Sequence, residues 1–188
     1  MKNKLGIGLF AGGERRRIGF APWKIVLLVA LVGLASFASS PARAVALSDY
    51  LENKLIDHVF RGTVYTAPGT IFIALYTAAC SDSAGGTEVA GGAYARASLT
   101  ATTTNWAGTQ SAGSTAVSSG TGGTTSNNTV ITFATPSAGW GLVTHIGMLD
   151  ALSGGNLLVC TALTTSKTIN SGDTVSFPAA SLTMQVDN

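Results

Sequence analysis

Two histidines are the first candidates for acid–base or metal chemistry in this chain. His58 follows Asp57, and His145 lies five positions before Asp150. A metal site usually needs three or more convergent His, Cys, Asp or Glu ligands, and neither neighbourhood supplies that spacing. We therefore interpret both histidines as structural residues, and we expect no metal site and no cofactor.

Other signatures of catalysis are missing from the sequence. It contains no Gly-x-Ser-x-Gly elbow, which would present a nucleophilic serine, and no Gly-rich phosphate loop ending in Lys-Ser or Lys-Thr. The acidic, Gly-rich segment 82–88 lacks the alternating oxygen ligands of a calcium-binding loop. We predict that the protein is not an enzyme and has no catalytic residues.

Cys80 and Cys160 are the only cysteines. If the chain is exported, an even pair favours a disulfide. The alternative is two separate thiols in the core or in loops. The sequence leaves both open.

Three aromatic residues, Tyr94, Trp106 and Trp140, are candidates for contact with a partner. Large aromatic side chains anchor protein interfaces and stack on sugar rings. They are also common in protein cores, and burial is the more frequent outcome.

The elements that would position these residues begin with a helix in the segment 45–62. Ser48 and Asp49 are good N-caps, and Gly62 is a suitable residue just past the C-terminus. One apolar face is formed by Leu51, Leu55, Ile56, Val59 and Phe60. We expect this face to pack within the domain; the alternative is an exposed face for a partner helix or a membrane.

After the helix, the sequence predicts about seven short strands. They are expected at residues 70–77, 94–101, 128–134, 140–149, 157–163, 174–177 and 182–186. Turn residues such as Ser153-Gly154-Gly155-Asn156 separate them at hairpin-like spacing. Because no helices alternate with these strands, the pattern favours an antiparallel β-sandwich preceded by one amphipathic helix.

Residues 107–127 differ from the rest of the β region. Gly, Ser and Thr make up fifteen of these twenty-one positions. Such a segment has little apolar surface to bury, so we expect a long flexible loop or an extended hairpin tip within a single domain of residues 45–188.

The first forty-four residues resemble a signal peptide. Arg15–Arg17 and Lys24 precede the apolar run 25–37, and Ala42-Arg43-Ala44 has the small-residue pattern of a cleavage site. Two alternatives stay open: an uncleaved membrane anchor, and an upstream segment that is not translated. In the last case Val45 marks the true start, since valine is the ordinary decoding of a GTG codon.

Charge divides the chain at the same place. Residues 1–44 carry seven basic residues against one acidic residue, whereas residues 45–188 carry four against eight. A mildly acidic domain without clustered Lys and Arg argues against binding to nucleic acid. Contact with a membrane is expected only through the leader.

The segment ALSDYLENKLIDHVFRGTVYTAPGTIFIALYTAA, residues 46–79, resembles the start of a family of small tailed-bacteriophage proteins described as tail-fibre-like or virion structural. The similarity continues in order to residue 177, through the segments 86–89, 91–96, 131–133, 140–147, 153–158, 162–164 and 170–177.

The resemblance implies a non-enzymatic virion component that assembles with itself and with other virion proteins, with host surface glycans as a further candidate partner. A start at Val45 predicts a virion protein, whereas a working signal peptide cleaved after Ala44 predicts a secreted or cell-surface protein. The alternatives are an exported bacterial surface or filament subunit and a secreted carbohydrate-binding β-sandwich.

Overall fold

The structure is a computed structural model that describes residues 47–186. The predicted leader, residues 1–44, and the junction at Ala44 and Val45 lie outside the described residues. Among the described residues, no helix is both long and apolar enough to cross a membrane.

The predicted helix is present as α1 (Asp49–Phe60). Ser48 is the N-cap, and its side-chain oxygen accepts a hydrogen bond from the Leu51 N–H at 3.2 Å. Gly62 adopts φ +70°, a left-handed conformation that glycine reaches without strain. The Thr63 N–H then bonds back to the Asp57 carbonyl at 3.0 Å, which closes the helix as the sequence predicts.

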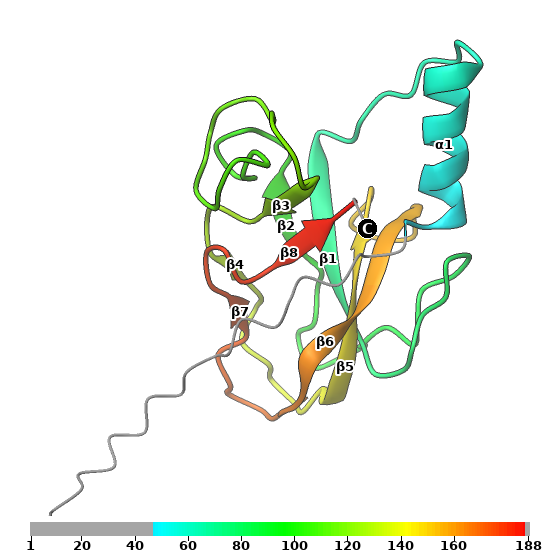
Figure 1. Cartoon of the computed structure of the whole chain (residues 1–188). Helices are drawn as coiled ribbons and strands as arrows, with labels where there is room; N and C mark the ends of the chain where they lie inside the picture. The colour runs from blue at the N-terminus through cyan, green and yellow to red at the C-terminus, as the bar shows by residue number, and fades with distance from the viewer. Residues whose placement is uncertain (1–46, 187–188) are drawn as a thin grey trace, which may run out of the picture. The chain divides into compact units, whose positions relative to one another are not determined.

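Eight strands follow α1 within the described residues, and every pairing between them is antiparallel. They are β1 (Thr70–Tyr76), β2 (Ala97–Thr100), β3 (Thr124–Ser126), β4 (Ile131–Thr132), β5 (Gly141–Leu149), β6 (Leu157–Ile169), β7 (Ser176–Phe177) and β8 (Thr183–Gln185). A four-stranded sheet has the order β2-β1-β5-β6, and two short pairs join β3 to β8 and β4 to β7 (Figure 1).

The main core lies between the four-stranded sheet and the two short pairs. Ile73 and Leu75 of β1 are buried there with Ile131 of β4 and Leu182, which directly precedes β8. The other face of β1 carries Ala74 and Tyr76, which form a smaller buried cluster with Leu149. The fold is therefore mainly β and antiparallel with one helix near the start of the described chain, which confirms the predicted fold class.

On the second face of β1, the Tyr76 side chain lies directly against the backbone of two glycines. The Tyr76 ring lies against Gly147 of β5, where an added Cβ would come within 2.5 Å of the ring. Gly85 contacts the same side chain from the loop that follows β1, where a Cβ would lie 2.8 Å from the Tyr76 hydroxyl. Only glycine leaves room for Tyr76 at these two positions.

Several strands are shorter than predicted, such as β2 and β4, and two differences go the other way. β3 lies inside the segment 107–127 that the sequence assigned to a loop, and β6 runs to Ile169 instead of ending at residue 163. Both extensions consist mostly of Thr and Ser, so apolar alternation does not reveal them. They are defined by backbone pairing, β3 with β8 and the second half of β6 with the start of β5.

Candidate functional site

The first turn of α1 attaches the helix to the edge of β6. The Ser48 N–H donates to the Leu158 carbonyl at 3.0 Å, and the Ser48 hydroxyl donates to the Leu157 carbonyl. The Asp49 N–H donates to the Asp82 carbonyl at 3.0 Å. Beyond this turn the helix extends away from the sheets (Figure 1).

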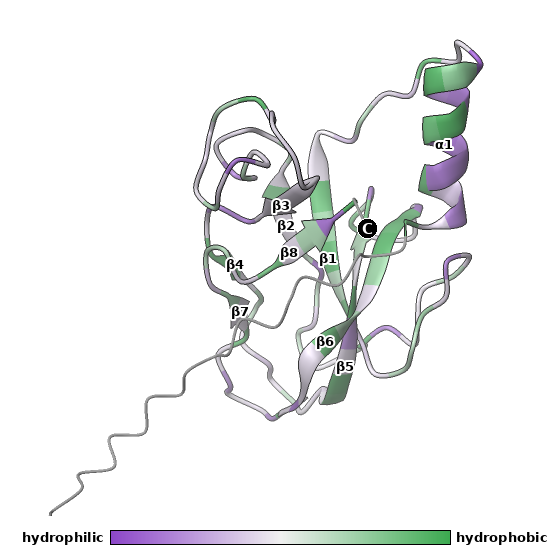
Figure 2. Ribbon diagram, viewed as in Figure 1, coloured by the Kyte–Doolittle hydropathy of each residue, from purple (hydrophilic) through white to green (hydrophobic). Residues whose placement is uncertain are grey.

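The apolar face of α1 is exposed, so the expectation that it packs within the domain is wrong. Exposure rises along the helix, from 37% at Leu55 and 50% at Ile56 to 63% at Val59 and 82% at Phe60. We call these four residues the exposed stripe. Figure 2 shows hydrophobic residues in the outer turns of the helix, away from its attachment to β6.

The orientation of α1 explains this exposure. Its half-buried residues are Tyr50, Leu51, Lys54 and Asp57, and their spacing places them on one face. On that face Tyr50 and Leu51 pack against the main core, beside the charged Lys54 and Asp57, and the Lys54 amine lies 5.5 Å from the centre of the Tyr50 ring. The Ser48 anchor therefore directs most of the stripe to solvent.

An apolar groove of about 580 Å³ opens beside α1. We define it by Leu51 of α1, Tyr65 of the linker, Trp106, Val117, Leu158 of β6 and Met184 of β8. No charged side chain lines it. Val117 is 82% exposed, and the floor belongs to the main core, so the groove is a place where that core is open to solvent.

Trp106 is the one candidate aromatic that lines the groove. Its backbone pairs with Asn127 in an isolated antiparallel bridge. Its indole N–H is buried and has no hydrogen-bond partner among the described residues. A buried donor without an acceptor is costly, and this indole N–H is the one buried side-chain polar atom without a partner among the described residues.

Tyr94 and Trp140 pack against the core of the domain instead. Trp140 is 5% exposed, and its ring meets the Tyr94 ring edge-on at 5.2 Å between centroids. The Trp140 indole N–H donates to the Gly92 carbonyl at 3.0 Å. The Tyr94 hydroxyl accepts from the Leu75 N–H at 3.0 Å. Trp140 is thus a buried core residue, and Tyr94 is a half-buried residue packed against the core.

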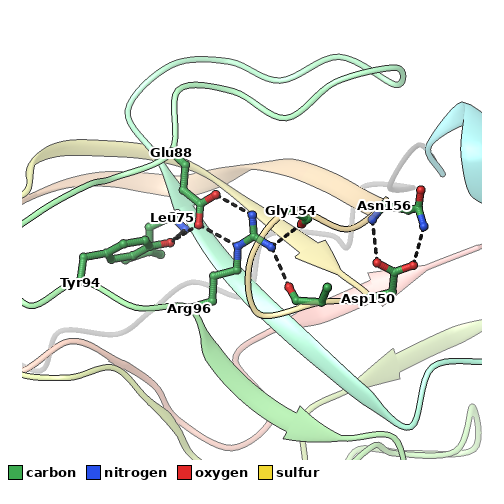
Figure 3. Close-up of polar contacts among 8 residues, drawn as sticks. Leu75, Glu88, Tyr94, Arg96, Asp150, Gly154 and Asn156 are labelled. Atoms are coloured by element: carbon green, nitrogen blue, oxygen red, sulfur yellow. Dashed lines mark hydrogen bonds and ion pairs between the residues drawn. The ribbon is translucent and has the colours of Figure 1, made fainter.

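A buried ion pair lies beside Tyr94 (Figure 3). The guanidinium of Arg96 donates to both carboxylate oxygens of Glu88, at 2.8 and 2.7 Å, and to the carbonyls of Ala151 and Gly154 at 2.7 and 2.8 Å. The Arg96 side chain is 8% exposed. One side chain therefore ties the loop after β1 to the β5–β6 turn.

The pKa of Glu88 reflects opposing influences. Burial alone would raise it, but hydrogen bonds from Arg96 and Tyr94 and the charge of Arg96 outweigh burial. The pKa of Glu88 therefore lies below its ordinary value. For Tyr94, burial raises the pKa of the hydroxyl, and its bond to Glu88 adds to the shift. Glu88 therefore stays charged and Tyr94 stays neutral near neutral pH. This suits a structural role, in which the cluster holds two loops together, better than proton transfer.

The structure pairs Cys80, in the loop after β1, with Cys160 of β6 as a disulfide, with Cα atoms 6.3 Å apart. The two histidines make local contacts on different elements, α1 and β5. His58 Nδ1 on α1 accepts from the Tyr65 N–H at 3.2 Å, and His145 Nδ1 lies 2.8 Å from the Thr144 hydroxyl. Among the described residues, no three His, Cys, Asp or Glu side chains gather as a metal site would need.

Comparison of the sequence with known families gives a match over most of the chain. Residues 46–185 match the family described as podophage GP4 fiber I protein gp80. The chain belongs to this phage fibre family. No curated protein matches the sequence. Membership confirms the resemblance to tail-fibre-like phage proteins, which was based on motifs spread over nearly the same residues.

Sequence reasoning about this fibre-family chain identified Trp106 but missed the groove and the ion pair. The groove depends on the direction in which α1 leaves the sheet, which no local pattern encodes. The ion pair left a weak signal: Arg96 lies between alanines in a predicted strand, in a domain with only four basic residues. A lone arginine in such a segment usually marks a buried partner.

Proposed function

We propose that this chain is a structural subunit of a phage tail fibre that acts through self-assembly and surface contact, without enzymatic activity. The observation that carries the proposal is the match of residues 46–185 to a phage fibre family. Partners are then other virion proteins and further copies of the chain. Contact with host glycans stays a prediction.

Two structural features support an assembly role. The exposed stripe and the apolar groove leave two hydrophobic surfaces uncovered on one small domain, and such patches mark protein interaction sites. Arg96 ties the loop at residues 77–96 to the turn at residues 150–156, and the Cys80–Cys160 pair ties the same loop to β6. Loops fixed in advance lose little conformational freedom on contact.

We further propose that residues 45–188 form the whole domain, with residues 1–44 absent from the assembled protein. The family match begins at Ala46, one residue after Val45. This boundary agrees with the change in charge at the same position.

Mass spectrometry of density-purified phage particles from the strain that carries the gene tests both proposals. We expect peptides from residues 47–186 in the particle fraction, in several copies per particle, and an N-terminus at residue 45 or 46. Peptides found only in the cell envelope or the medium would contradict the virion role and favour an exported surface subunit. Peptides from residues 1–44 in particles would contradict the boundary.

A further inference from the structure

We propose that a polar pocket beside the buried ion pair binds a neutral ligand with neighbouring hydroxyl groups, the chemistry of a sugar. Its volume is about 360 Å³, within the ~300–1,000 Å³ of ordinary small-molecule sites. We define the polar pocket by five of its lining residues, Tyr76, Gly85, Glu88, Arg96 and Gly154. The inference rests on the fibre function proposed above, because it names a chemistry for the surface contact in that proposal.

The Tyr76 hydroxyl points to a ligand. Tyr76 is 2% exposed and lines the pocket. An added Cβ at Gly85 would lie 2.8 Å from the hydroxyl oxygen, which places that oxygen at the pocket wall. Burial raises the pKa of Tyr76 and the charge of Glu88 adds to the shift, while no hydrogen bond contributes. Because a buried phenol ordinarily has a hydrogen-bond partner, this hydroxyl is available to an occupant of the pocket.

Arg96 supplies a second available group. Its side chain is 8% exposed. Four of its N–H groups donate to four acceptors, the two Glu88 carboxylate oxygens and the carbonyls of Ala151 and Gly154 (Figure 3). A guanidinium carries five N–H groups, so one N–H on Nη2 has no partner among the described residues.

Glu88 supplies an acceptor in the same pocket. Its side chain is 28% exposed, so it is within reach of a ligand. The carboxylate accepts three hydrogen bonds, one from the Tyr94 hydroxyl and two from Arg96. A carboxylate offers about four acceptor sites, so one acceptor site remains for a ligand.

These groups favour a neutral ligand over a charged one. The charges of Glu88 and Arg96 neutralise each other, so an ion entering the pocket would lose hydration without gaining a net countercharge. Neighbouring sugar hydroxyls suit the free positions: one donates to the Glu88 carboxylate, and the next accepts from the Arg96 N–H. Hydrogen bonds to ionised groups are the stronger kind, so a small number of them suffices for recognition.

The walls of the polar pocket are held in place before a ligand arrives. The loop after β1 bonds back to its own strand, with the Val89 N–H donating to the Leu75 carbonyl at 2.9 Å. On the opposite wall, Gly154 and Gly155 adopt φ of +60° and +76°, which glycine reaches without strain. A ligand therefore orders little of the protein when it binds.

Nuclear magnetic resonance titration of the full chain tests the pocket. The probes are the methyl glycosides of glucose, galactose, mannose, rhamnose and N-acetylglucosamine, each at millimolar concentration. We expect at least one of them to shift the backbone amide signals of Gly85 and Gly154. Absence of these shifts with every probe would overturn the proposal.

Tyr76→Phe tests the hydroxyl itself, since it keeps the ring and removes the one oxygen. We expect about fivefold weaker binding of the same probe, the effect of one ordinary hydrogen bond, and an unchanged midpoint of thermal unfolding. Tyr65→Phe is the matched control, because Tyr65 lies outside the polar pocket, and it should bind the probe as wild type does. Equal binding by Tyr76→Phe and wild type would overturn the proposal, as would a lower midpoint for Tyr76→Phe, which would show that its hydroxyl already has a partner in the protein.

Polysaccharide extracted from the surface of the host strain distinguishes the source of the sugar. Tighter binding of the polysaccharide than of the best glycoside, with the same loss in Tyr76→Phe, assigns the pocket to a host glycan, whereas equal binding per sugar residue assigns it to free sugars. A chain that is present in phage particles but binds no probe would overturn the pocket alone. A chain that binds a probe but is absent from particles would overturn the fibre role alone.

Discussion

Arg96 is the side chain on which the most contacts depend. It neutralises Glu88 and donates to two carbonyls from a different turn, while it is almost fully buried. Arg96→Ala leaves a half-buried carboxylate and two carbonyls without their donor. We expect a loss of about 3 kcal/mol in the free energy of unfolding, measured by urea denaturation.

Arg61→Ala is the matched control for this loss. Arg61 pairs with Asp57 at 2.8 Å on the surface of α1, and its side chain is 71% exposed. Such exposed pairs contribute about 0.5 kcal/mol or less. Equal losses from the two substitutions would show that the buried cluster is not a clamp.

The same cluster predicts a pH dependence. The pKa of Glu88 is lower in the folded protein than in the unfolded chain, so its charged form stabilises the fold. This contribution is complete above the unfolded pKa of about 4.3 and is lost as the pH falls through the lower, folded pKa. The stability difference between wild type and Glu88→Gln should be constant from pH 7 to 5 and shrink below pH 4.5. A difference that grows on acidification would contradict this assignment.

Single-residue predictions from sequence succeeded where local chemistry decides. Ser48 and Gly62 act as caps because their side chain and backbone freedom suit those positions in any helix. Local sequence could not predict which aromatic side chains pack in the core and which line the groove. Tyr94 and Trp140 meet across 46 residues of sequence, and only the completed fold brings them together while leaving Trp106 at the groove.

Among the strands, β3 and β8 are held by a buried polar residue. Asn127 is fully buried; its amide nitrogen donates to the Thr129 and Pro178 carbonyls, both at 2.8 Å, and its oxygen accepts from the Leu182 N–H at 2.9 Å. This explains how a segment of Gly, Ser and Thr acquires a strand without apolar residues. The sequence rule that such segments stay unpaired considers only hydrophobic burial.

Asn127→Ala should therefore destabilise the protein by about 2–4 kcal/mol, since three backbone groups lose their partner in a buried place. Thermal unfolding followed by circular dichroism measures this. Asn128→Ala is the neighbouring control: it loses one bond to the Gly113 N–H at 3.1 Å and one to the Ser114 carbonyl at 3.3 Å, in the loop. A smaller effect at Asn127 than at Asn128 would contradict the role of Asn127.

The Cys80–Cys160 pair links the loop after β1 to β6 across 80 residues of sequence. Closing a loop of that length restricts the unfolded chain and is worth about 4 kcal/mol. We predict no reactive thiol in denatured, unreduced protein and a marked drop in the midpoint of thermal unfolding after reduction. Two reactive thiols per chain would show that the cysteines are not bonded.

Helix α1 shows where sequence patterns stop being sufficient. Its start, its end and its apolar face were all predicted correctly, because each depends only on residues of the helix and its two ends. The direction in which that face points was not predicted. It depends on hydrogen bonds from Ser48 and Asp49 to backbone carbonyls far along the chain, those of Leu157, Leu158 and Asp82. An amphipathic helix is expected to bury its apolar side in its own domain, but here the attachment of the first turn leaves that side exposed.

For the chain as a whole, the fold class followed from the spacing of short strands and turns, and family membership agrees with motifs spread from residue 46 to residue 177. The pairing of strands distant in sequence did not follow, since β1 lies between β2 and β5 and nothing local specifies that order. The exposed stripe and the groove beside it are likewise surfaces that only the completed fold creates.

Immunogold electron microscopy of intact phage particles, with antibodies raised against the purified chain, tests the fibre assignment most directly. We expect gold particles on the tail fibres, several to a virion, and none on the capsid. Labelling confined to the capsid, or to the surface of uninfected bacteria, would contradict it.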